Sequence, residues 1–293
     1  MRKIFIAILC IASIFISGCA SNNEYTQLVL TQAEFPRMDG STATIPLGEA
    51  VAAVLMGISR EEASQFAVFT GTDSAHRRLA NREVDLLIVY GASQQTKDNL
   101  PEYSQFKRAA IGSDALVFLV NVSNPVDSLT ICQIRGIYTG EITNWSEVGG
   151  LDAPIAPFQR NATAGSQALM ESLVMGDTPM MNPPEHFLHE GMGMMVTAVS
   201  NFDTGQNAIG YNVFYFVTEM LNDPNVKIIA VNGVAPEKST IADGSYPLTN
   251  NFYAIIREED ALTASAAFLV FDWLQGIEGQ TLIDLEGYAA LMR

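Results

Sequence analysis

One short segment combines a cation, hydroxyl groups and small residues in a pattern suited to binding an anion. It reads FQRNATAGSQ, and within it Arg160 carries a planar cationic fork, Gly165 lets a ligand approach the backbone, and Ser166 adds a hydroxyl donor. Arg160 is the only lysine or arginine between Arg135 and Lys227. The segment therefore predicts a site for an oxyanion or carboxylate. The alternative is an ordinary strand-to-helix loop with a surface arginine.

The elements predicted around this segment favour the anion site. Residues 155–158 read as a short strand, and apolar residues then recur at helical spacing from Ala168 to Val174, with Gly176 as a stop. The first N–H groups of a helix have no internal partner, and the helix dipole places partial positive charge there. A strand, a small-residue turn and a helix start together form an anion-binding arrangement.

Hydroxyl groups recur in three other predicted loops between strands and helices. Ser41 and Thr42 precede a helix predicted over 46–56, and they either cap it or offer hydroxyls to a ligand. Thr72 opens a second predicted helix, and Ser93 follows the apolar strand 84–90. Because ligands of open α/β sheets bind beyond the carboxyl ends of strands, we expect these turns to meet.

The order of elements predicts the fold class. Strands alternate with helices along the whole chain, without an internal repeat or a strong linker, which indicates α/β layers with mostly parallel sheets. The predicted strands are 27–30, 66–69, 84–90, 115–121, 155–158, 207–211, 226–230 and 246–256.

The N-terminus predicts export. Arg2 and Lys3 precede an apolar run over 4–16, which is too short for a comfortable membrane span. Residues 16–19 (ISGC) resemble a bacterial lipoprotein signal, in which the peptide is cut before the cysteine and the cysteine is lipidated. We therefore expect a signal peptide over 1–18, lipidation of Cys19 and a polar tether over 19–26. A plain secretory signal is the alternative.

Charge and cysteine content exclude several classes of function. The formal net charge of −16 would become −18 without residues 1–18, which carry two basic residues and no acid. Such a protein is not expected to bind nucleic acid or an acidic membrane face. After cleavage Cys132 would be the remaining thiol, and its apolar helical surroundings predict a small buried side chain. The histidines have no cysteine companions at ligand spacing, so no metal or cofactor is expected.

Five segments in order resemble the phosphate-binding proteins of bacterial phosphate ABC importers. They are 39–42 (DGST), 140–150 (GEITNWSEVGG), 160–166, 208–211 (AIGY) and 246–249 (YPLT), and their spacing fits nearly all of the mature chain. The resemblance implies a two-lobe, hinged type II periplasmic-binding-protein fold, each lobe a mostly parallel sheet flanked by helices. Lobe I would comprise 27–118 and 249–293, and lobe II 119–248.

The same resemblance implies a set of ligand groups on four loops. Ser41, Thr42 and the backbone of Ala43 would form the first, and Thr72, with Ser74 as a further candidate, the second. Arg160, the amides of Ala164 and Gly165, and Ser166 would form the fourth. The third loop departs from the family, which usually places an aspartate there. Here Gln94 follows Ser93, which leaves Tyr90 or Ser93 as a neutral substitute. Ala164 also replaces a common serine, and Gln167 a frequent arginine.

The resemblance implies a monomeric, non-enzymatic protein on the extracytoplasmic face of the cell membrane. It would capture phosphate or a related small oxyanion, deliver it to an ABC permease, and contact the membrane only through its N-terminal lipid. A sensory or interaction lipoprotein that retains the fold is the alternative. A hydrolase with Ser41 or Ser166 as nucleophile is disfavoured, because only His76 lies near a hydroxyl loop in the sequence.

Overall fold

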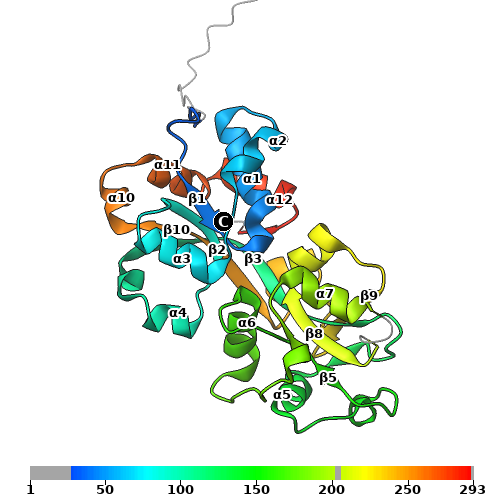
Figure 1. Cartoon of the computed structure of the whole chain (residues 1–293). Helices are drawn as coiled ribbons and strands as arrows, with labels where there is room; N and C mark the ends of the chain where they lie inside the picture. Colours follow the sequence, from blue (N-terminus) through cyan, green and yellow to red (C-terminus); the bar gives the residue numbers. More distant parts are fainter. Residues whose placement is uncertain (1–27, 202–205, 292–293) are drawn as a thin grey trace, which may run out of the picture.

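The computed structural model describes residues 28–201 and 206–291, which form two lobes around one long strand (Figure 1). This strand, β3, runs over Phe106–Asn121. Elements that precede β3 lie in one lobe with the C-terminal helices, and elements between β3 and β10 (Thr249–Arg257) form most of the other. The expected signal peptide, lipidated Cys19 and tether lie outside the described residues.

The lobes share a nine-stranded sheet with the order β1-β2-β10-β3-β8-β5. In addition, β11 and β9 pair with β3, and β4 pairs with β9. The central pairings, of β3 with β10, β8, β9 and β11 and of β10 with β2, are antiparallel, whereas β1–β2, β5–β8 and β4–β9 are parallel. The α/β class is confirmed, and the departure from the expected parallel pairing is confined to the central strands. The bounds are β1 Met38–Gly40, β2 Leu86–Tyr90, β4 Ser128–Leu129, β5 Ala156–Pro157, β8 Ala208–Val213, β9 Val226–Val231 and β11 Ala289–Ala290.

The antiparallel centre follows from the way the chain passes between the lobes. β3 pairs with β10 as far as Ala115 and with β8 from Leu116 onward. β3 carries the chain out of the first lobe, while β10 brings it back in the opposite direction. Alternation of strands and helices predicts parallel pairing only where the chain stays within one layer.

Helices flank the sheet in both lobes (Figure 1). The first lobe holds α1 Ile45–Met56, α2 Arg60–Ala63, α3 Thr72–Ala80, α4 Gln94–Asp98, α10 Glu258–Leu262, α11 Ala266–Trp273 and α12 Ile277–Leu285. Between β3 and β10 lie α5 Ile131–Thr139, α6 Gly165–Leu169, which continues as a π-helical segment over Met170–Met175, α7 Met192–Ser200, a second π-helical segment over Phe216–Leu221, and α9 Lys238–Ala242. Over 28–201 and 206–291, no single helix is long and apolar enough to cross a bilayer.

Cys132 differs from its predicted position. The apolar face of α5 buries Ile134, Ile137 and Tyr138, whereas Cys132 is exposed. Successive helical residues are rotated by about 100°. The thiol therefore points away from the face that packs on the core.

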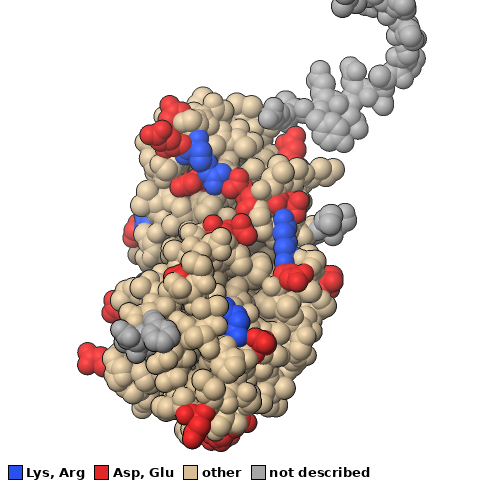
Figure 2. All heavy atoms as spheres, turned by 90° about the vertical axis from the view of Figure 1, so that its right-hand side faces the viewer, with Lys and Arg blue, Asp and Glu red and all other residues tan. Residues whose placement is uncertain are grey.

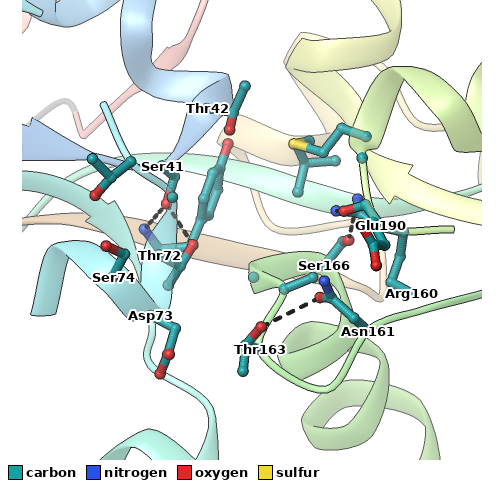
Figure 3. Close-up of a pocket in the computed structure, with 18 of the residues that line it drawn as sticks. Ser41, Thr42, Thr72, Asp73, Ser74, Arg160, Asn161, Thr163, Ser166 and Glu190 are labelled. Atoms are coloured by element: carbon teal, nitrogen blue, oxygen red, sulfur yellow. Dashed lines mark hydrogen bonds between the residues drawn. The ribbon is translucent and has the colours of Figure 1, made fainter. Parts of the chain in front are cut away.

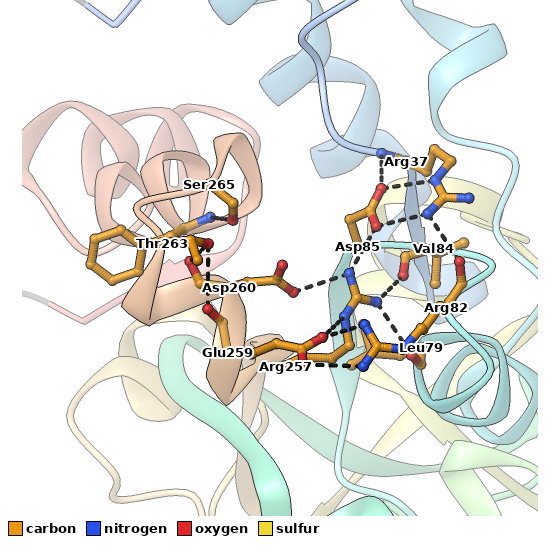
Figure 4. A network of polar contacts seen from close by, with 11 residues as sticks. Arg37, Leu79, Arg82, Val84, Asp85, Arg257, Glu259, Asp260, Thr263 and Ser265 are labelled. Carbon is orange, nitrogen blue, oxygen red and sulfur yellow. Dashed lines mark hydrogen bonds and ion pairs between the residues drawn. The ribbon is translucent and has the colours of Figure 1, made fainter.

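A polar network joins the end of β10, where the chain re-enters the first lobe, to the residues just before β1 and β2 (Figure 4). Asp85 accepts hydrogen bonds from Arg37 (2.8 Å) and Arg257 (2.9 Å), and Arg257 also pairs with Asp260 (3.0 Å). Burial alone would raise the pKa of Asp85, but the bonds from the two arginines outweigh burial and hold that pKa below its usual value. Ionised Asp85 thus fastens β10 beside the start of β2.

Candidate anion-binding site

A cavity of about 260 Å³ lies between the lobes and collects most of the predicted site residues (Figure 3). Ser41 and Thr72 lie on one side, and Arg160 and Ser166 on the other. The residues that line it are Ser41, Thr42, Thr70, Gly71, Thr72, Asp73, Ser74, Arg77, Tyr90, Arg160, Asn161, Thr163, Ala164, Gly165, Ser166, Glu190, Gly191, Met192 and Val213. Turns separated by more than a hundred residues therefore meet. The prediction of a strand over 66–69 before Thr72 is wrong, because Ser64–Phe66 form a 3-10 helical turn and no strand lies between it and Thr72.

Hydroxyl groups line the first lobe's side of the cavity in fixed positions. Ser41 Oγ and Thr72 Oγ1 lie 2.8 Å apart, and the backbone N–H of Tyr90 donates to Ser41 Oγ (3.1 Å). Since one hydroxyl donates to the other, one proton of the pair remains available to a ligand. Behind them, fully buried Asp39 accepts from both the N–H (2.6 Å) and the hydroxyl (2.7 Å) of Thr70, which fixes the loop before α3.

Four helical segments begin at this cavity. The residues immediately before them are Ser41, Gly71, Ala164 and Gly191, and none of these four caps its helix through a side chain. The first amides of each segment therefore keep their hydrogen-bonding capacity, and their dipoles add positive potential. The start of α7, at Gly191, was not among the predicted site residues, although the sequence shows glycines at the beginning of this helix.

Arg160 is the principal cation of the cavity. Its side chain is largely buried and donates to the carbonyls of His189 (2.9 Å) and Glu190 (2.8 Å) and to Ser166 Oγ (3.2 Å). Three of its five N–H groups are thus used, and two remain. Burial lowers the pKa of Arg160, yet arginine remains charged at any physiological pH. No ion pair joins Arg160 to a carboxylate among the described residues.

A buried tyrosine holds the loop that carries Arg160. Tyr211 Oη accepts from the Arg160 backbone N–H (3.1 Å) and donates to the side chain of Gln167. Gln167 in turn donates to Glu171 (2.9 Å). Gln167 therefore supports the loop rather than presenting a group to the cavity.

Glycine at position 165 allows the two lobes to touch. A Cβ atom there would lie 2.6 Å from Thr72 Oγ1. The adjacent amide of Ala164 donates to the Asn161 carbonyl (3.1 Å). Ala164 lines the cavity, but its N–H is therefore already used in the turn, in contrast to the expected ligand role.

Two predicted site residues lie elsewhere. Ala43 is fully buried inside the helical turn after Ser41 and is absent from the cavity lining. Ser93 accepts the N–H of Thr96 (3.1 Å) as the cap of α4, and it lines a separate cavity of about 1030 Å³. Of the two neutral candidates for the third loop, the structure places Tyr90 at the predicted cavity and Ser93 outside it.

Several lining residues escaped the sequence prediction. Arg77 forms an ion pair with Asp73 one helical turn earlier and adds a half-exposed cation at the edge. Its i, i+4 spacing from Asp73 was a usable signal. Asn161, Thr163 and Glu190 could not be recognised, because only the fold places them at the cavity.

Comparison with known proteins identifies the family. A family model described as a PBP superfamily domain matches residues 37–273. The chain belongs to this superfamily. It is similar to the phosphate-binding protein PstS of Borreliella burgdorferi, with 21% identity over 206 residues, covering 70% of this chain and 72% of the relative. The similarity to PstS of Bacillus subtilis is 29% over 129 residues, 44% of this chain and 40% of that protein.

Solved structures share the fold. An ABC-type phosphate transport receptor from Vibrio cholerae has a TM-score of 0.63 and 25% identity, covering 87% of this chain and 99% of that chain. A phosphate-bound substrate-binding protein structure from Clostridium perfringens has a TM-score of 0.68 and 24% identity, with 87% and 98% covered. These relatives are named as binding and transport proteins rather than as enzymes.

Proposed function

We propose that this protein captures phosphate, or a related small oxyanion, in the interlobe cavity and delivers it to an ABC importer. The observation that carries the proposal is the convergence of four helix starts and the two free N–H groups of Arg160 on one small space. All of these groups are donors, and together they suit a compact tetrahedral anion. The names of the similar proteins support the same ligand.

Capture is proposed to involve a hinge between lobe I (27–118 and 249–293) and lobe II (119–248). The change of partners along β3, from β10 to β8, supports a flexible point near the first crossing. Closure would bring Ser41 and Thr72 toward Arg160 and expel water, which strengthens charge-assisted hydrogen bonds.

Isothermal titration of the mature protein with phosphate, sulfate, molybdate and small carboxylates tests the proposal. We expect phosphate binding, and we expect Arg160→Ala to weaken it by about 2–4 kcal/mol, the scale for losing one partner of a buried charged contact. Lys227→Gln is the matched control, because it removes a cation from the same lobe at a position outside the cavity. No binding of any of these anions would exclude the capture role.

We further propose that Cys19 carries the lipid that tethers the protein on the extracytoplasmic face. Incorporation of labelled palmitate into the expressed chain, and its loss in Cys19→Ser, is the expected result. Release of the wild-type chain into the medium without label would contradict the anchor.

A further inference from the structure

A groove on the surface of the first lobe, separate from the interlobe cavity, is lined mostly by apolar side chains. It has a volume of about 360 Å³ and lies between α1 and α12, which are neighbours in Figure 1. The residues that line this α1–α12 groove are Leu28, Val54, Leu55, Trp273, Ile277, Glu278, Thr281, Leu282 and Leu285. None of them lines the proposed oxyanion cavity.

Helix α12 presents apolar side chains to solvent at this groove. Ile277 is 81% exposed and Leu285 is 76% exposed, and Thr281 lies between them at a spacing of four residues, which places all three on one side of the helix. The Thr281 hydroxyl donates to the Ile277 carbonyl (2.7 Å), so its polar group is engaged. The opposite side of α12 buries Gly279 and Ile283. Contiguous exposed apolar surface of this kind marks contact with another molecule or with a membrane.

The polar groups of the groove favour a neutral apolar partner. The indole N–H of half-buried Trp273 donates to the Glu278 carboxylate (2.8 Å), so the ring combines an apolar body with a polar edge, as tryptophan does at membrane–water interfaces. Among the described residues that line the groove, Glu278 is the one carboxylate and none is a lysine or an arginine. An anionic surface would therefore find no cation to attract it here.

The position of the groove in the chain brings it close to the proposed membrane anchor. Leu28, the first described residue, lines the groove, and residues 20–27 separate it from Cys19. A stretch of this length spans about 30 Å when fully extended and roughly 16 Å as a flexible coil. A lipid on Cys19 would therefore keep the groove near the bilayer. The tether itself has one large apolar side chain, Tyr25, which is too little to cover the groove.

We propose that the α1–α12 groove is a second membrane contact, in which Val54, Ile277 and Leu285 rest in the interface of a bilayer with uncharged headgroups. This inference rests on the proposed lipid anchor, and it replaces the expectation that the lipid alone touches the membrane. Once the lipid is inserted, the groove meets the bilayer at a high effective concentration, so a small apolar patch is enough for contact. The contact fixes which face of the first lobe lies against the membrane.

Tryptophan fluorescence of the full lipidated chain tests this contact, because its two tryptophans lie in different lobes. Trp273 lines the groove, whereas Trp145 is 2% exposed and belongs to the second lobe. The chain is bound to phosphatidylcholine vesicles whose acyl chains carry bromine, which quenches only indoles close to the bilayer. We expect quenching in the wild type and its loss in Trp273→Phe.

A double variant, Ile277→Ser with Leu285→Ser, tests whether this surface makes the contact. It should lose the quenching yet still float with the vesicles, because its lipid is unchanged. The matched control is Leu151→Ser with Leu221→Ser, which removes two exposed leucines from the second lobe and should keep the wild-type quenching. Thermal melting checks the folding of each variant. Vesicles with anionic headgroups should give weaker quenching than neutral vesicles.

Several outcomes would overturn the inference. A wild type that floats with the vesicles without quenching refutes the contact and leaves the lipid anchor standing. Unchanged quenching in the double variant refutes it as well, because the contact would then lie elsewhere. A dimer in detergent that dissociates in the double variant would assign the groove to a second copy instead. If the wild type does not float, the anchor and the inference both fail, while phosphate titration still decides the capture role. Should the double variant not fold, the comparison of the wild type with Trp273→Phe decides.

Discussion

Replacement of Gly165 by alanine tests whether contact between the lobes is needed for binding. The new Cβ would lie 2.6 Å from Thr72 Oγ1, whereas ordinary contact begins at 3.4 Å, so the two groups must separate by about 0.8 Å. Thr72 cannot turn away freely, because its hydroxyl is bonded to Ser41 at 2.8 Å. Either the lobes part or this bond breaks.

The size of the effect follows from hydrogen-bond geometry. A separation of about 0.8 Å takes a bond of normal length beyond the useful range, so a ligand held by both lobes loses one or two charge-assisted bonds. At roughly 1.5–3 kcal/mol each, phosphate affinity should fall between about tenfold and several hundredfold. The melting temperature of the ligand-free protein should fall by no more than the loss of one buried hydrogen bond explains, because alanine suits a helix start and the φ angle of Gly165 is not positive.

Isothermal titration and thermal melting of Gly165→Ala measure both quantities. Gly193→Ala is the matched control, because that glycine lies in the first turn of α7 and a Cβ there would meet nothing within 4 Å. Equal phosphate affinity in Gly165→Ala and the wild type would refute the argument. So would an equal loss in the control, since that would show a general sensitivity of these helix starts.

Two further predictions concern stability. Burial lowers the pKa of His76 to about 4. The buried neutral imidazole therefore contributes stability that is fully present above the unfolded pKa of 6.5. Roughly 3 kcal/mol of that folding stability is lost as pH falls toward 4, because the unfolded chain takes up a proton that the folded chain does not. Burial raises the pKa of Asp114 to about 6, so the folded chain takes up this proton first and gains a similar amount of folding stability as pH falls. The loss from His76 and the gain from Asp114 therefore largely offset each other in the wild type. In urea unfolding, the free energy of unfolding of His76→Gln should therefore rise relative to that of the wild type from pH 7 to pH 4. Parallel plots of unfolding free energy against pH for the two proteins would contradict this. Arg257→Ala should cost about 2–3 kcal/mol in urea unfolding, because it removes a partner of partly buried Asp85, whereas Arg82→Ala, which breaks an exposed pair, should change little.

The sequence predicted the parts of the site that depend on local signals. Ser41, Thr72 and Ser166 were recognised because a hydroxyl or glycine before a helical pattern marks a helix start, and every such start has free amides. Arg160 stood out because it is the only cation in a long acidic stretch of sequence. These features need no knowledge of which segments meet.

The parts that were missed depend on long-range geometry. Ser93 follows a buried strand as Ser41 does, yet its hydroxyl caps α4 and its loop faces a different cavity. Asp114 lies in an apolar strand 24 residues beyond Tyr90, and only the crossing of β3 brings the two together. The antiparallel centre of the sheet was missed for the same reason, because direction is set where the chain changes lobes.

The acidic exterior bears on how quickly a ligand arrives. The chain has a formal charge of −16, and Figure 2 shows acidic groups gathered beside the few cations on the face it presents, while Arg160 is buried in the cavity. For the proposed oxyanion, the long-range field is repulsive, and attraction begins only within the cavity. Added salt screens that repulsion over distances of about 10 Å. Encounter should therefore become faster as ionic strength rises, the reverse of the electrostatic steering that many anion-binding proteins use.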